Sequence, residues 1–267
     1  MGIFEAIKKG FVQASKLMSL VLIFFIFNVV IGLISLPLTN PANAGNPAIV
    51  AVSIISSILF FLVFIYLQGG ALGTVNDQLK TGSSSLAQFT GYGSKFYVRI
   101  LGLLLIYLLI AIGIVLVLSL ISAGLLLLGD NAVMRSLVAL IVTIVAVGVI
   151  TLLIYPIYSI VVEDIGAIAA LKRGILVAVK NFWRTLGVFI VLLLVSLVIS
   201  LVVGFLAGLI TIPLGDIASR IILSIINAAV QSYIPIVMMV AFMSFYLSLI
   251  KNEGLQSHQG GEGQMTA

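Results

Sequence analysis

The sequence predicts an all-α integral membrane protein with six transmembrane helices. Of its 267 residues, 62% are hydrophobic and 8% are charged, whereas about a quarter of the residues in a soluble domain are charged. The apolar residues form six runs that reach the roughly 20 residues needed to cross a hydrocarbon core about 30 Å thick. The runs lack the alternation of a membrane barrel, so we expect helices. They comprise residues 18–37, 48–68, 100–128, 136–162, 186–214 and 221–250.

The last four runs are longer than a membrane span requires. They average about 28 residues, or roughly 42 Å at 1.5 Å per residue, so we expect them to tilt, kink or project beyond the bilayer. Proline disturbs two of them, because it cannot donate a hydrogen bond to the carbonyl four residues earlier. Pro156 predicts a break near the inner end of its helix, and Pro235 leaves the carbonyl of Gln231 in need of another partner.

The lysine and arginine residues predict the orientation of the chain. Arg135 and Arg220 fall on one side of the predicted spans, and the other eleven bases fall on the opposite side. The positive-inside rule places the eleven in the cytoplasm, together with both termini, and so predicts a multi-pass protein of the plasma or inner membrane. These bases are Lys8, Lys9, Lys16, Lys80, Lys95, Arg99, Lys172, Arg173, Lys180, Arg184 and Lys251.

The first apolar run could also be read as a signal peptide. Residues 42–44 (ANA) follow it and resemble a small-residue cleavage site. The run has about 20 residues, however, whereas the apolar part of a signal peptide has 7 to 15. We therefore expect the run to remain as a membrane span.

Three cytoplasmic segments share a pattern that predicts an internal repeat. Residues 7–16 (IKKGFVQASK) match residues 171–180 (LKRGILVAVK), and residues 89–99 (FTGYGSKFYVR) form a fainter copy. In the fainter copy, Gly93 and Arg99 keep the separation between the glycine and the last base of the other two. We predict three hairpins of two spans, each preceded by a cytoplasmic amphipathic interfacial helix.

The repeat gives the predicted domain organisation. Residues 1–250 form one membrane domain, with approximate repeats at 1–80, 81–163 and 164–250. Residues 251–267 contain no apolar run and are rich in Gly and Gln. Such a segment cannot bury enough apolar surface to fold, so we expect a disordered cytoplasmic tail.

The bases of the interfacial helices are candidate contacts for lipid headgroups. On a helical wheel of residues 166–184, the basic side chains share one arc and the apolar side chains occupy the opposing arc. A helix of this kind lies in the membrane interface, with its bases toward lipid phosphates. The alternative is that these helices only anchor and orient the hairpins. The candidates are Lys8, Lys9, Lys16, Lys172, Arg173, Lys180 and Arg184.

A polar face on the last span is the candidate ligand cavity. Ser224, Asn227 and Gln231 are spaced at i, i+3 and i+7 and so share one helix face. Asn28 lies in the middle of the first span, and Pro235 frees a carbonyl nearby. The alternative is simple hydrogen bonding between helices, worth about 0.6 kcal/mol per bond. No charged residue falls mid-span, which disfavours an ion-coupled pump.

The sequence offers little chemistry for catalysis. The single histidine, His258, lies in the tail, and there is no cysteine, so no Ser-His or Cys-His pair can form inside the bilayer. Nucleotide-binding and metalloprotease motifs are also absent from the sequence. The basic residues form no face interleaved with aromatic residues, as nucleic-acid binding requires. We predict no catalytic residue, metal, cofactor or nucleic-acid partner.

Four acidic residues near the ends of predicted helices are interpreted as helix caps. Asp130 and Asp216 precede the fourth and sixth runs, where a cap is favoured over an aspartyl pair. Glu163 and Asp164 precede the basic helix of the third repeat, whose N-terminus favours negative charge. A contact from this pair to Lys172 or Arg173 is the alternative.

Residues 163–184 (EDIGAIAALKRGILVAVKNFWR) resemble a motif of a known family. The motif is cytoplasmic in the YciC-like proteins and in the membrane domain attached to some bacterial glycerophosphodiester phosphodiesterases. Gly174 stands here in place of the usual serine. The resemblance implies a six-helix membrane module concerned with lipids or other amphiphiles, without the phosphodiesterase barrel, for which this chain has no room. The residues that fit are Glu163, Ala170, Leu171, Arg173 and Asn181.

Two functions remain open from the sequence. The first is a non-enzymatic membrane protein that binds or moves a lipid, an amphiphile or a small hydrophobic solute. The second is a scaffold, accessory or immunity-type protein that acts through another membrane protein. Membrane lipids are an expected partner in both cases.

Overall fold

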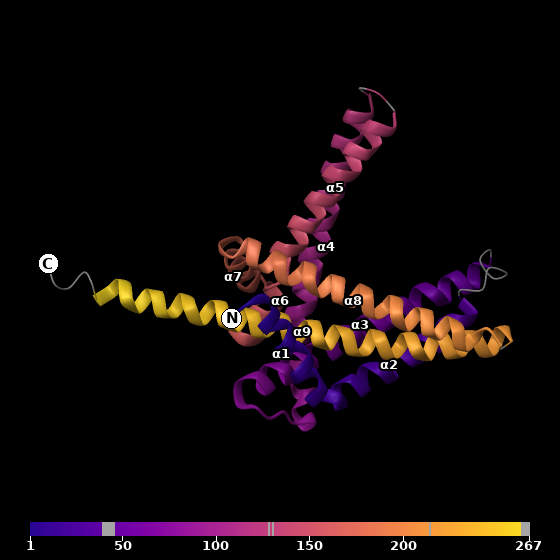
Figure 1. Ribbon diagram of the computed structural model, residues 1–267, viewed down its shortest axis with the longest axis horizontal. Coiled ribbons are helices and arrows are strands. Elements are labelled where there is room, and N and C mark those ends of the chain that lie inside the picture. The colour runs from indigo at the N-terminus through magenta and orange to yellow at the C-terminus, as the bar shows by residue number, and fades with distance from the viewer. Residues whose placement is uncertain (39–45, 128, 130, 214, 263–267) are drawn as a thin grey trace. The chain divides into compact units, whose positions relative to one another are not determined.

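The computed structural model describes residues 1–38, 46–127, 129, 131–213 and 215–262, and every regular element within these ranges is a helix (Figure 1). Six helical segments are long and apolar enough to cross a membrane, as in a multi-pass membrane protein. The all-helical class and the number of candidate spans agree with the prediction. The proposed cleavage site at residues 42–44 lies outside the described residues.

The chain divides into two compact units. The first comprises Met1–Tyr97 with Gly187–Ala267, and the second comprises Val98–Leu186. Short 3-10 helices, η1 (Ser15–Leu17) and η3 (Leu86–Gln88), precede α2 and α4. The α-helices are α1 (Ile3–Ala14), α2 (Met18–Leu38), α3 (Pro47–Thr81), α4 (Phe89–Leu127), α5 (Ala132–Leu153), α6 (Pro156–Val162), α7 (Ala167–Lys180), α8 (Phe182–Thr211) and α9 (Asp216–Glu262).

Helix α3 begins and ends on local signals in the sequence. The side chain of Asn46 accepts a hydrogen bond of 3.0 Å from the backbone N–H of Ala48, and Pro47 occupies the first turn. The helix continues past the predicted run because residues 69–75 are buried. It ends at Gly82, whose φ of 76° is a left-handed conformation that favours glycine.

The expected break at Pro156 is present, since α5 ends at Leu153 and α6 begins at the proline. The cap of α5 corrects the prediction that Asp130 occupies this position. Asn131 is the capping residue, and its side chain accepts a 3.0 Å hydrogen bond from the N–H of Met134. The side chain of Asn131 therefore caps α5, the role that was expected of Asp130.

Helix α9 is longer than the sequence suggests. It runs without interruption past Pro235 and continues through residues 251–262, where we expected disorder. A continuous helix satisfies its own backbone hydrogen bonds, and these residues contain no proline to stop it. The rest of the predicted tail, residues 263–267, lies outside the described residues.

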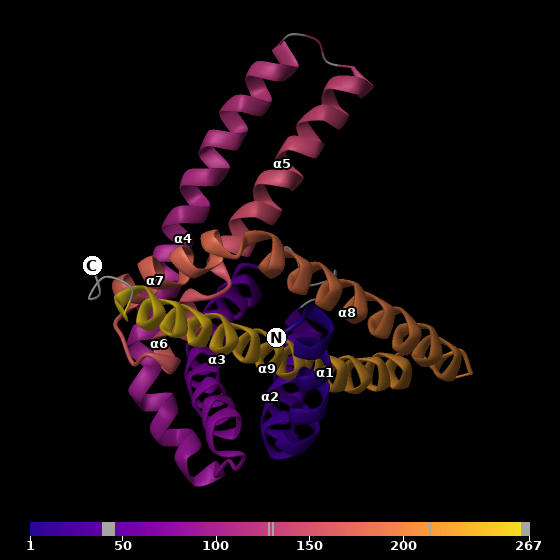
Figure 2. The same cartoon turned by 60° about the vertical axis from the view of Figure 1, so that its left-hand side comes forward.

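The core of the first unit forms around α9. This helix packs against α1, α2 and α3, and α1 and α2 lie beside it in both views (Figures 1 and 2). In the apolar window of α9, 61% of the residues are buried, against 6–22% in the other five candidate spans. Its buried side chains include Val240, Phe245 and Tyr246. The last helix of the chain is thus the central one of this unit.

Several helix contacts among the described residues depend on a glycine, and three of them involve the glycines of the predicted repeats. A Cβ atom on Gly10 of α1 would lie 2.9 Å from the carbonyl oxygen of Val237 in α9, and one on Gly93 of α4 would lie 2.8 Å from the ring of Tyr66 in α3. In the second unit, a Cβ on Gly174 of α7 would overlap the backbone of Pro156 in α6. The glycines let these helices approach more closely than any other residue would allow.

The contact at Gly174 predicts a loss of stability on substitution. Gly174→Ala should lower the thermal unfolding temperature in detergent, because overpacking against the Pro156 backbone costs about 1–3 kcal/mol. Gly148→Ala in α5 is the matched control in the same unit, since a Cβ there would meet nothing within 4 Å. An equal loss in both variants would contradict the close-packing explanation.

Candidate functional site

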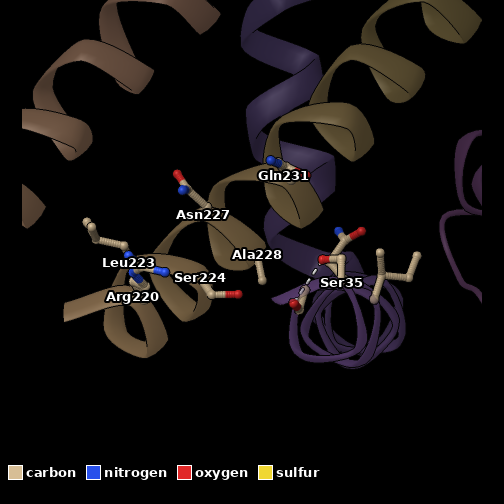
Figure 3. A pocket seen from close by; sticks show the side chains of 10 residues that line it. Ser35, Arg220, Leu223, Ser224, Asn227, Ala228 and Gln231 are labelled. Atoms are coloured by element: carbon tan, nitrogen blue, oxygen red, sulfur yellow. Dashed lines mark hydrogen bonds between the residues drawn. The ribbon is translucent and has the colours of Figure 1, made fainter. Parts of the chain in front are cut away.

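A polar groove between α2 and α9 is the candidate functional site of the first unit (Figure 3). Its volume is about 450 Å³. Four of the five residues that the sequence suggested for a cavity line it, namely Asn28, Ser224, Asn227 and Gln231. The complete lining consists of Asn28, Ile31, Gly32 and Ser35 from α2, and Arg220, Leu223, Ser224, Asn227, Ala228 and Gln231 from α9.

A hydrogen bond between the two helices closes one part of the groove. The side-chain N–H of Asn28 donates to the hydroxyl oxygen of Ser232 at 3.0 Å. That hydroxyl in turn donates to the backbone carbonyl of Ala228 at 2.5 Å, and Ser232 is fully buried. Asn28 therefore lines the groove and also makes a hydrogen bond between helices, as the alternative interpretation expected.

Gly32 makes room for a hydroxyl in the wall of the groove. A Cβ atom at this position would lie 2.5 Å from the hydroxyl oxygen of Ser224. Figure 3 shows Ser224 projecting from α9 toward α2, where Ser35 lies. The hydroxyl of Ser35 donates to the carbonyl of Gly32 at 2.9 Å. This end of the groove is thus lined by two hydroxyl groups across a glycine.

The side-chain amides of Asn227 and Gln231 retain their hydrogen-bonding capacity. Both residues are exposed on α9, and within the described part of the chain neither amide makes a hydrogen bond. Each amide carries two N–H donors and a carbonyl acceptor. In a segment apolar enough to span a membrane, such groups need a polar partner, because leaving them unpaired in hydrocarbon is costly.

Pro235 does not belong to the groove. It is exposed on α9 and is absent from the residues that line the groove. Since α9 continues regularly through the proline, this residue produces no break there. Its place in the candidate cavity was inferred from the carbonyl of Gln231, to which it cannot donate, and this does not decide which helix face the proline itself occupies.

The sequence analysis missed several residues of the site. Arg220 precedes Ser224 by one helical turn and Ser35 follows Asn28 by two, so helical spacing could have placed both on the polar stripes. Helical spacing in the sequence does not single out Gly32 or Ser232 as residues of the site. Their roles depend on which helix lies opposite, and local periodicity does not supply that information.

The small-residue faces of α1 and α7 pack inward, and most of their bases point outward. The buried residues Ala6, Gly10 and Ala14 of α1 follow the same spacing as Ala170, Gly174 and Ala178 of α7. Large apolar side chains are exposed beside the bases, among them Phe4, Ile168 and Trp183. The exposed candidate headgroup contacts are Lys8, Lys16, Lys172, Lys180 and Arg184, while Lys9 and Arg173 are half-buried.

The acidic residues before α7 form ion pairs. Glu163 lies 3.3 Å from the guanidinium of Arg173, and Asp164 lies 2.6 Å from the guanidinium of Arg99. The N-cap of α7 is Gly166, with no side-chain capping bond. The prediction that Glu163 and Asp164 cap α7 is therefore wrong, and the alternative contact to Arg173 is present. Arg173, a candidate headgroup contact, is engaged by a carboxylate.

Comparison with known proteins identifies the family of the chain. No curated protein and no solved structure matches it. Residues 1–249 match the model of a family described as a domain of unknown function, DUF7847. Because this match covers nearly the whole chain, the protein belongs to the DUF7847 family.

Proposed function

We propose that this chain is a non-enzymatic membrane protein that binds or moves an amphiphile, whose polar part occupies the groove between α2 and α9. The observation that carries the proposal is that the amides of Asn227 and Gln231, in a groove of about 450 Å³, make no hydrogen bond to any described residue. An amphiphile would supply the hydrogen bonds that the protein does not. A groove of this size is in the range of small-molecule sites.

An apolar depression on the same two helices supports an amphiphile over a wholly polar solute. It has a volume of about 350 Å³. Its walls carry apolar side chains and little polar surface, as an acyl chain would require. The residues that line it are Met18, Val21, Leu22 and Phe25 of α2, and Ala229 and Tyr233 of α9.

The proposal includes the threefold arrangement of interfacial helices and hairpins. Its support is the common position of Gly10, Gly93 and Gly174 in the proposed repeats, where each glycine packs against an even-numbered span. In this scheme the interfacial helix of each repeat contacts the hairpin of the preceding repeat. The interfacial helix of the first repeat contacts the hairpin of the third. The resemblance to the YciC-like proteins, which implies a six-helix membrane module, agrees with this arrangement.

A second candidate is a scaffold or accessory protein, of the immunity type for example, whose partner is another membrane protein. Its support is the second unit, where α4 and α5 expose large apolar side chains. Leu109 is 70% exposed and Leu120 is 75% exposed on α4, and Val133 is 73% exposed on α5. Lipid or a partner helix would cover these surfaces equally well.

Native mass spectrometry of the purified protein separates the two candidates. Co-purified lipid bound at a fixed stoichiometry is the expected result. In Asn227→Leu/Gln231→Leu, lipid retention should fall by about tenfold, because two hydrogen bonds of 0.5–1.5 kcal/mol each are lost. Ser57→Leu is the control, as Ser57 is an exposed polar residue of α3 outside the groove. A lipid-free protein that co-isolates with one stoichiometric partner would instead support the scaffold.

The proposed orientation, with both termini cytoplasmic, has a direct test. The chain contains no cysteine, so a single introduced thiol reports its own accessibility. A membrane-impermeant maleimide should label Gly215→Cys, before α9, in intact cells. Ser84→Cys, between α3 and η3, should be labelled only after the cells are opened, because the positive-inside rule keeps its flanking bases in the cytoplasm. The reverse pattern would overturn the orientation.

A further inference from the structure

We infer that the groove between α2 and α9 selects an anionic headgroup and that Arg220 binds its charged group. This inference rests on the proposed function and adds the chemical class of the ligand. It starts from the composition of the groove wall. Among the ten described residues that line the groove, Arg220 has the one ionisable side chain.

The positions on α9 give the groove a direction. Arg220, Ser224, Asn227 and Gln231 follow at i, i+4, i+7 and i+11, which places them on one stripe of the helix. The stripe is about 16 Å long at 1.5 Å per residue. One end therefore carries a permanent positive charge, and the rest carries neutral amides and hydroxyls.

The charged end of the groove is rich in hydrogen-bond donors. A guanidinium presents five N–H donors and no acceptor, and within the described residues the hydroxyl of Ser224 makes no hydrogen bond. Figure 3 shows Arg220 and Ser224 next to each other on α9. Arginine binds phosphate and carboxylate through two parallel hydrogen bonds. A zwitterionic headgroup offers the same phosphate oxygens, but its cationic group repels the guanidinium, and a neutral headgroup offers no charge to pair with.

The apolar residues beside Arg220 strengthen this preference. The guanidinium of Arg220 brings a positive charge and five N–H donors to the groove. The helix walls beside it are apolar, with Ile31 and Leu223 in the lining. A charge near hydrocarbon gains most from a ligand of the opposite sign, since water screens their attraction less there.

The chain provides its own control in Arg135. The segment from Leu128 to Arg135 resembles the segment from Leu214 to Arg220, so the two arginines hold related places after outer turns. Arg135 is exposed and does not line the groove. A non-specific effect of surface charge would involve both arginines, whereas a ligand site involves only Arg220.

The test is native mass spectrometry of the full chain in detergent with equal amounts of phosphatidylglycerol and phosphatidylcholine. The wild type should retain the anionic lipid about tenfold more, a difference of 1.4 kcal/mol. Arg220→Gln should remove this preference while still binding either lipid weakly. Arg135→Gln should keep the preference in full. Arg220→Lys should keep part of it, because the charge remains while the paired hydrogen bonds are lost.

The outcomes separate this inference from the proposed function. If the wild type retains both lipids equally, or if Arg220→Gln keeps the preference, anion selection is overturned while amphiphile binding stands. Equal loss in Arg135→Gln also overturns it. If the wild type retains neither lipid, the proposed function itself fails. Adding inorganic phosphate identifies the source of the anion: displacement of the lipid supports a site for the free anion, and no displacement supports a lipid headgroup.

Discussion

Lipid tails solvate apolar side chains as well as a neighbouring helix does, so close packing at small residues has to hold these helices together. The contacts at Gly10, Gly93 and Gly174 meet this requirement. Each brings one helix close to another, α1 to α9, α4 to α3 and α7 to α6. Gly32 plays a similar part between α2 and α9, where the space it leaves holds a hydroxyl group. The polar groove thus depends on the same constraint as the fold.

The described part of the chain combines two kinds of helix contact with different consequences. Where a glycine meets backbone, as Gly174 meets Pro156, the contact is tight and intolerant of a methyl group. Where polar side chains meet, as Asn28 meets Ser232, one hydrogen bond suffices and the adjoining space remains open. A ligand site in a membrane bundle requires the second kind, supported by the first, because tight packing everywhere would leave no volume for a ligand.

The sequence supported the spans and part of the site because both follow from local spacing. Six apolar runs and the common face of Ser224, Asn227 and Gln231 depend only on the helical repeat. The partner of that face could not be predicted, since the pairing of α2 with α9 joins residues some two hundred positions apart. Glu163 was misassigned for a related reason. A carboxylate before a helix suits a cap and an ion pair equally, and only the position of Arg173 decides between them.

The packing of α1 against α9 has a consequence for biosynthesis. Translation makes α1 before α9, but the surface that covers Gly10 belongs to α9. Until α9 is inserted, the face of α1 that packs against it lacks its native cover. Helix α1 therefore reaches its native contacts with α9 only after all the intervening helices are made, and slow translation would expose it to chaperones and proteases.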